Sequence, residues 1–80
     1  MSIFEFIDLH LEVKAEAVFS GIFLANRYED DSIYQLYYLS KFFVEVEYIP
    51  KENVVCGFHP FTSKVFLNAY VQDINLYDLV

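Results

Sequence analysis

Residues 32–49 of this 80-residue chain, SIYQLYYLSKFFVEVEYI, restrict the possible folds more than any other segment. Tyrosine, phenylalanine and β-branched residues dominate both halves, and such residues are typical of strands. The polar residues Ser40 and Lys41 separate the halves and suit a two-residue hairpin turn. In that turn Leu39 pairs with Phe42, and the register of the whole hairpin follows from this pair. The segment therefore predicts two antiparallel strands.

This register sorts the side chains onto two faces, because successive residues of a strand point in opposite directions. The first face, which we expect to be the core, carries Ile33, Gln35, Tyr37, Leu39, Phe42, Val44, Val46 and Tyr48. A five-residue loop over residues 49–53 then adds Val54, Cys56 and Phe58 to the same face. The two turns thus agree on which face of the sheet is buried.

The strand before the hairpin, residues 21–28, is joined to it by a loop whose length the residues leave open. A four-residue loop over residues 29–32 buries Ile22 and Leu24 with the first face and turns Arg27 to the opposite, second face. The side chains that we expect on this second face, and that we take as candidates for a protein interface, are Phe23, Arg27, Tyr34, Leu36, Tyr38, Phe43, Glu45, Glu47 and His59.

Two helices are predicted outside the strands. Residues 8–20 alternate as a strand would, but Ala, Leu, Glu and Lys favour a helix there, and Gly21 follows as a left-handed stop. Residues 60–74 predict a second helix, with Phe66, Leu67 and Tyr70 on its apolar side.

These elements predict a single α+β domain over residues 1–80, in the order α-β-β-β-β-α. Its four-stranded antiparallel meander sheet should carry the N- and C-terminal helices on one face.

The chain has more apolar residues than one small core can hold. It is 56% hydrophobic and 20% aromatic, whereas a domain of this size buries only roughly 60% of the surface of its unfolded chain. The surplus predicts a small non-enzymatic interaction module, a homodimer that associates through the aromatic second face or through a sheet edge.

The charge of the chain suggests an alternative function. Twelve Asp and Glu against five Lys and Arg give a net charge of −7, which disfavours direct binding to nucleic acid. An acidic surface suits a basic partner, as in an inhibitor or immunity-type protein that neutralises a basic protein such as a nuclease. This alternative requires Glu29, Asp30, Asp31, Glu45 and Glu47 to share one surface.

No group of residues predicts catalysis, a cofactor or a metal site. Glu45 and Glu47 share a face, but a small flat sheet offers no desolvated cleft for acid–base chemistry, so we expect solvent-facing charges. His59 should lie beside Phe43 without a nucleophile, and His10 lacks further ligands near it.

Three further expectations concern the acidic turn, the cysteine and a pocket. Residues 29–31 lack the spacing of a calcium loop. Cys56 should be a buried apolar residue, and as a single cysteine it allows no internal disulfide. A third functional possibility is a ligand site between helices and sheet around Tyr37 and Tyr48.

The N-terminal residues MSIFEFIDLHLEV do not have the pattern of a signal peptide, and no apolar run approaches the roughly 18 residues of a membrane span. We therefore expect a cytoplasmic protein without a membrane partner. The stretch FFVEVEYIPKENVVCGFHPFTS, with GIFLANRY upstream, resembles a group of small uncharacterised bacterial proteins of helix, four-strand meander, helix pattern. The likeness covers most of the chain but consists of strand and cap patterns, so it implies a fold and no function.

Overall fold

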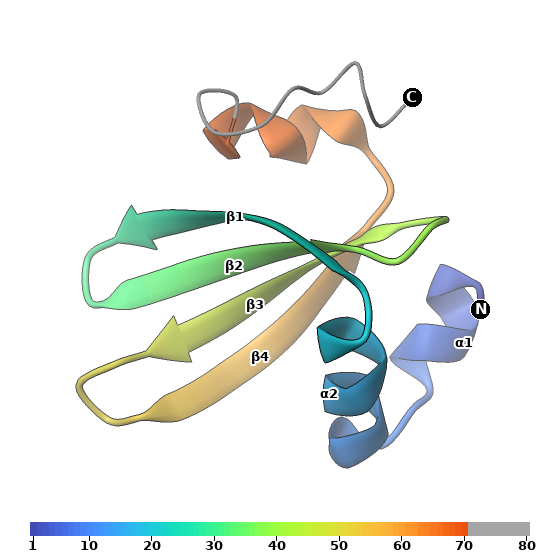
Figure 1. Ribbon diagram of the computed structural model, residues 1–80, viewed down its shortest axis with the longest axis horizontal. Coiled ribbons are helices and arrows are strands. Elements are labelled where there is room, and N and C mark those ends of the chain that lie inside the picture. The colour runs from blue at the N-terminus through green and yellow to red at the C-terminus, as the bar shows by residue number, and fades with distance from the viewer. Residues whose placement is uncertain (71–80) are drawn as a thin grey trace.

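The computed structural model describes residues 1–70. The elements follow the order α1 (Ile3–Ile7), α2 (Leu11–Phe19), β1 (Ile22–Glu29), β2 (Ser32–Tyr38), β3 (Phe43–Ile49), β4 (Val54–Phe61) and the 3-10 helix η1 (Lys64–Tyr70). The four strands form one antiparallel sheet in chain order, as Figure 1 shows. The predicted α+β class and the four-stranded meander are confirmed.

The N-terminal helical region is divided in two, where the sequence predicted one helix over residues 8–20. The hydroxyl of Ser2 accepts a hydrogen bond from the Glu5 amide, and the Glu5 carboxylate accepts one from the Ser2 amide. This capping box begins α1, which ends at Ile7 with Asp8 as its C-cap. The break between α1 and α2 lets Phe6 and Val18 both enter one core.

Gly21 is required for a reason other than the one predicted. It does not have a positive φ, so it is not a left-handed helix stop. A Cβ atom at this position would lie 2.9 Å from the carbonyl oxygen of Tyr38 and 3.1 Å from that of Val18. Glycine is therefore needed because the backbone passes close to β2 as it leaves α2.

The predicted register of the central hairpin is confirmed. The β2–β3 pairs run from Ile33 opposite Tyr48 to Tyr38 opposite Phe43. The amide of Leu39 donates to the carbonyl of Phe42 at 2.9 Å, which closes the two-residue turn.

The first strand follows the prediction only near its turn. Arg27 lies opposite Tyr34 as expected, but a bulge at Leu24 shifts the register between Phe23 and Ala25. The prediction that Phe23 lies on the second face is wrong, because the bulge pairs it with Tyr37, and the two rings lie 5.5 Å apart.

The same bulge moves Leu24 to the second core, so its predicted burial on the first face is also wrong. Ile22, predicted to be buried, is exposed.

The last strand is displaced by two residues from its predicted register over most of its length. Phe58 lies opposite Val46 and His59 opposite Glu45. One residue of the shift comes from the loop, which is one residue shorter than predicted and pairs Ile49 with Val54, and the other comes from a bulge at Cys56. A shift by two residues keeps each side chain on its face, so Phe58 still packs on the first core. The predicted burial of Cys56 is wrong, since the bulge leaves it exposed.

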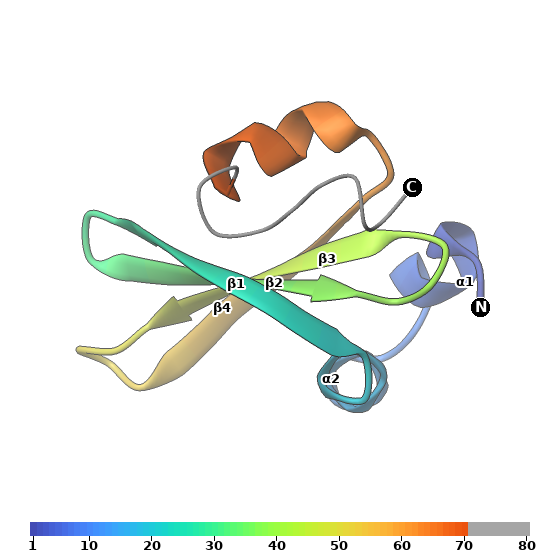
Figure 2. The ribbon, with the colours of Figure 1, turned by 45° about the horizontal axis from the view of Figure 1, so that its top comes forward.

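Both faces of the sheet are covered, and each has its own core (Figures 1 and 2). The first core contains Phe6, Val18, Phe42, Val44 and Val46, with α1 and α2 over it. The second core contains Ala25, Leu36, Phe43, Leu67 and Tyr70, with η1 over it.

The prediction that both helical regions cover one face is therefore wrong. The first face is already filled by Phe6 and Val18, whereas Leu67 and Tyr70 fit the apolar residues of the second face. The predicted second helix is a 3-10 helix from Lys64, and β4 continues through Pro60, which an edge strand tolerates. Residues 71–74 of that predicted helix and the tail lie outside the described residues.

Candidate functional site

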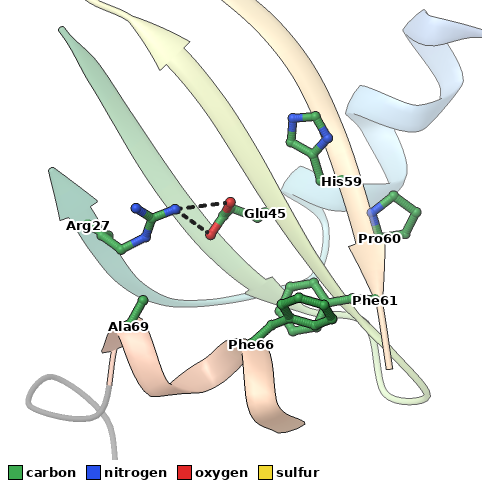
Figure 3. A pocket seen from close by; sticks show the side chains of 7 residues that line it. All are labelled: Arg27, Glu45, His59, Pro60, Phe61, Phe66 and Ala69. Atoms are coloured by element: carbon green, nitrogen blue, oxygen red, sulfur yellow. Dashed lines mark hydrogen bonds and ion pairs between the residues drawn. The ribbon is translucent and has the colours of Figure 1, made fainter. Parts of the chain in front are cut away.

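A cleft of about 530 Å³ lies between η1 and the second face of the sheet. Its lining residues are Arg27, Glu45, His59, Pro60, Phe61, Phe66 and Ala69 (Figure 3). The strands supply the first five of these residues, and η1 supplies Phe66 and Ala69. Apolar walls with a few convergent polar groups are the usual composition of a binding site, so this cleft is the candidate site.

The apolar wall of the cleft extends the second core toward solvent. The rings of Phe43 and Phe61 are stacked with centroids 5.5 Å apart. The ring of Phe66 meets Phe61 edge-on at the same centroid distance. Phe66 is 62% exposed, and its ring is the outermost of this row of three aromatic rings.

The charged wall is built on Arg27. One Nη atom, Nη2, lies 3.3 Å from both carboxylate oxygens of Glu45, and the other, Nη1, is paired with Glu29. The guanidinium lies over the ring of Tyr34, 4.2 Å from its centroid. Burial opposes the charge of Arg27, but its partners Glu29, Tyr70 and Glu45 outweigh burial and raise its pKa.

Glu45 is held at the base of the cleft by two donors. The hydroxyl of Tyr70 donates to Oε2 of Glu45 at 2.6 Å, and Arg27 donates from the other side. Burial and the carboxylate of Glu45 raise the pKa of Tyr70, so its hydroxyl remains a donor at neutral pH. The side chain of Glu45 is only 18% exposed and presents a positioned negative charge.

A second carboxylate, Glu47, lies two residues along the same strand. The hydroxyl of Ser32 donates to its Oε2 at 3.2 Å, and Nε2 of His59 lies 3.6 Å from its Oε1. Burial together with the nearby carboxylates of Glu47 and Glu29 raises the pKa of Tyr34. This end of the second face therefore has a negative electrostatic environment.

The structure separates the predicted interface residues into a buried group and a group around the cleft. Leu36 and Phe43 are buried within the protein itself, and Tyr38 is partly buried beside them. Arg27, Tyr34, Glu45, Glu47 and His59 are brought together around the cleft and its acidic border. His59 lies next to Glu45 and Glu47 rather than beside Phe43.

Five residues of the site were not predicted to belong to it: Pro60, Phe61, Phe66 and Ala69, which line the cleft, and Tyr70, which holds Glu45. The prediction put Phe66, Leu67 and Tyr70 on one apolar side of a helix that was expected to meet the first face. Leu67 and Tyr70 are buried together, but Phe66 is exposed, because a 3-10 helix aligns residues three apart. A pocket around Tyr37 and Tyr48 was predicted instead. The described cleft lies on the opposite face, and the hydroxyl of Tyr48 donates to Oδ1 of Asn53 at 2.6 Å.

Residues 1–70 contain neither a candidate metal site nor a helix that could span a membrane. No group of three or more His, Cys, Asp or Glu side chains in this part of the chain could hold a metal ion. None of the helices in the same residues combines the length and apolar character needed to cross a bilayer.

Comparison of the chain with known protein families, curated proteins and solved structures finds no significant match. The resemblance to small bacterial proteins that the strand pattern suggests stays a prediction. Function must therefore be argued from the geometry of the cleft and from the charges around it.

Proposed function

We propose that this protein is a small non-enzymatic interaction module that binds a basic protein and offsets its charge. The observation that carries the proposal is the gathering of acidic residues at one end of the second face. Arg27 donates to the carboxylates of both Glu29 and Glu45. Glu47 accepts a hydrogen bond from Ser32, which lies at the start of β2 beside the turn that follows Glu29. Asp30 and Asp31 are exposed at the turn between β1 and β2.

The charges of this acidic surface, which comprises Glu29, Asp30, Asp31, Glu45 and Glu47, are only partly offset. Among residues 1–70, Arg27 forms ion pairs with two of these carboxylates. His59 adds a positive charge only when it is protonated. Five carboxylates with one arginine form a local negative field that attracts and orients a basic partner. Proteins that bind nucleic acid, such as nucleases, carry basic surfaces of the required kind.

The proposal is tested by titrating the full chain with a panel of basic nucleases, with an acidic protein as negative control. The double variant Asp30→Asn, Asp31→Asn removes two charges from the acidic surface. Asn tolerates the positive φ of 54° at Asp30, so the turn is retained. The matched control is Glu12→Gln, Glu16→Gln, which removes two exposed charges from α2.

We expect the turn variant to lower affinity by about three- to tenfold at low salt, because surface charges act mainly through long-range attraction. The α2 control should bind as the parent protein does, and added salt should remove the difference. Equal losses in both variants would mean that only net charge matters, and an absence of binding by the parent protein would contradict the proposal.

Homodimer formation is a second candidate, supported by a different surface. Aromatic side chains gather on the first face at the C-terminal end of α2, where Phe19 packs on Tyr37 and Phe58. Phe23 joins them and is 48% exposed. Because η1 covers Leu36 and Phe43, this surface leaves more apolar area to a second copy than the centre of the second face does.

Sedimentation equilibrium over a wide concentration range tests the homodimer. If Phe23 lies in a dimer interface, Phe23→Ser should weaken dimerisation at least about tenfold. Val65→Ser, at an exposed position of η1, should leave it unchanged. A monomer at every concentration would exclude this candidate.

A further inference from the structure

We propose that the cleft between η1 and the second face receives an arginine side chain of the basic partner. This inference rests on the proposed function and deepens it, because it assigns one specific anchor within a broadly acidic surface. Interfaces commonly depend on a few anchor side chains in pockets, and arginine is prominent among them.

The charges around the cleft favour a cation over an anion. Nη1 of Arg27 is paired with Glu29 and Nη2 with Glu45, while Nε is buried without a partner among residues 1–70. The unpaired Nε is buried and the outward Nη atoms are already neutralised by carboxylates, so an incoming anion would gain little from Arg27 and would approach the carboxylates of Glu45 and Glu47. Electrostatic repulsion excludes acidic groups from this position.

The carboxylate of Glu45 in the cleft and that of Glu47 at its border still have acceptor capacity. Within the described residues, Oε1 of Glu45 accepts from Arg27 at 3.3 Å, and Oε2 accepts from Tyr70 and Arg27. A carboxylate has about four lone-pair positions, so Glu45 can accept another donor. Oε1 of Glu47 lies 3.6 Å from Nε2 of His59, which is too long for a strong hydrogen bond.

The apolar wall determines which kind of cation fits. Phe61 and Phe66 present aromatic rings, and Pro60 adds a further apolar surface beside them. A guanidinium is planar and weakly hydrated, so it stacks on aromatic rings while its N–H groups reach a carboxylate. Its alkyl stem packs along apolar residues. Lysine has a compact, strongly hydrated ammonium and uses this combination less well.

The size of the cleft agrees with such an anchor. Sites for drug-sized ligands measure about 300–1,000 Å³. The volume of about 530 Å³ accommodates an arginine side chain together with part of the chain that carries it. Figure 3 shows Glu45 between Arg27 and His59, with Phe61 and Phe66 beside it.

The test uses the full ¹⁵N-labelled chain and two probes, acetyl-Gly-Arg-Gly-amide and the matched peptide with citrulline in place of arginine. Citrulline keeps the shape of the side chain but has no charge. We expect the arginine peptide to shift the amide resonances of His59, Phe66 and Ala69. The citrulline peptide should bind at least about tenfold more weakly, because it lacks the charge-assisted hydrogen bonds.

Phe66→Ala is the decisive variant, with Val65→Ala as its control. Both side chains are exposed, at 62% and 69%, so neither change should unfold η1. Only Phe66 lines the cleft. We expect Phe66→Ala to weaken binding of the arginine peptide by about tenfold, as for an anchor contact, and Val65→Ala to leave it unchanged. Glu45→Gln is less suitable alone because it also removes a partner of Arg27.

The outcomes separate this inference from the proposed function. If basic nucleases bind but the arginine and citrulline peptides bind equally, the cleft is not an arginine pocket and the proposed function stands. Equal affinities of the Phe66→Ala and Val65→Ala proteins for the arginine peptide would have the same meaning. If neither the nucleases nor the arginine peptide binds, both proposals fail.

Discussion

The two faces of the sheet are built from the same strands and differ in what they bury. The first core, under α1 and α2, contains only apolar side chains such as Phe6, Val44 and Val46. The second core continues from Leu36 and Phe43 into the buried end of a charged network, where Tyr70 contacts Glu45. The first face is therefore used for folding, whereas the second face divides its residues between folding and a polar cleft.

This difference explains part of the surplus of aromatic residues. The sequence suggested that one core could not hold them, and the structure places a second core beneath η1. Alternation along β3 directs Val44 and Val46 to one face and Phe43 to the other, together with Glu45. The charged part of the second face and the exposed aromatic residues Phe19 and Phe23 are then left to explain by binding.

The largest expected effect is a loss of stability when either core is truncated. Phe6→Ala should cost about 3–5 kcal/mol and Leu67→Ala about 2–5 kcal/mol in free energy of unfolding, because both side chains are fully buried. Urea denaturation measures both, and Val65→Ala provides an exposed control in η1 that should change stability by less than about 0.5 kcal/mol. A cost for Leu67→Ala as small as that of the control would mean that η1 does not cover a real core.

A smaller effect is expected when the hydrogen bond between Tyr70 and Glu45 is removed. Tyr70→Phe keeps the ring in the second core but removes its hydroxyl, which donates to a carboxylate at 2.6 Å. We expect a loss of about 1.5–3 kcal/mol, the usual range for hydrogen bonds to charged groups. A loss below about 0.5 kcal/mol would show that the polar part of the second face does not contribute to folding.

The stability of the protein at alkaline pH should depend on the same hydroxyl. The pKa of Tyr70 is raised by burial and by Glu45, above an unfolded value of about 10. Its contribution is therefore fully present below about pH 10 and is lost as the pH rises through the folded pKa. Denaturation at increasing alkaline pH should show a smaller decline in the Tyr70→Phe protein, and equal declines would contradict this assignment.

A moderate loss of stability is expected when the N-terminal cap of α1, on the first face, is removed. Ser2→Ala removes the acceptor for the Glu5 amide, and losing such a cap costs about 0.5–2 kcal/mol. Hydrogen bonding to Ser2 also lowers the pKa of Glu5, so its contribution should be present above its unfolded pKa and be lost as the pH falls through the lower folded pKa. Acid denaturation of the parent and the variant measures both, and identical curves would exclude the cap.

The smallest effect is expected at Cys56. Because the bulge in β4 leaves this thiol exposed, Cys56→Ser should change stability by less than about 0.5 kcal/mol. A thiol reagent should modify Cys56 in the native protein as fast as in the unfolded protein. Strong protection of the thiol in the native protein would instead support the predicted register, in which Cys56 is buried.

The regions that could be predicted share a short, local constraint. A turn of two residues fixes how Leu39 meets Phe42, and every later pair of β2 and β3 follows. The turn between β1 and β2 similarly sets Arg27 opposite Tyr34. The bulges at Leu24 and Cys56 were missed, because an extra residue in a strand leaves the composition of the strand unchanged.

The candidate site could be predicted only in part. The residues of the strands that face it, including Arg27, Glu45 and Glu47, follow from alternation. Phe66 and Tyr70 could not be assigned to it, because the periodicity of a helix shows which side is apolar but not which face of the sheet it meets.

Four properties could be read from the residues alone: the strand order, the central register, the acidic charge and the presence of more apolar residues than one core requires. These properties depend on neighbouring residues and on composition, which are visible in one dimension. Tertiary structure alone decided that η1 packs opposite α1 and α2, and that Arg27, Glu45 and Tyr70 meet. The direction in which the chain leaves β4 selects between two apolar faces, and that choice depends on packing between distant segments.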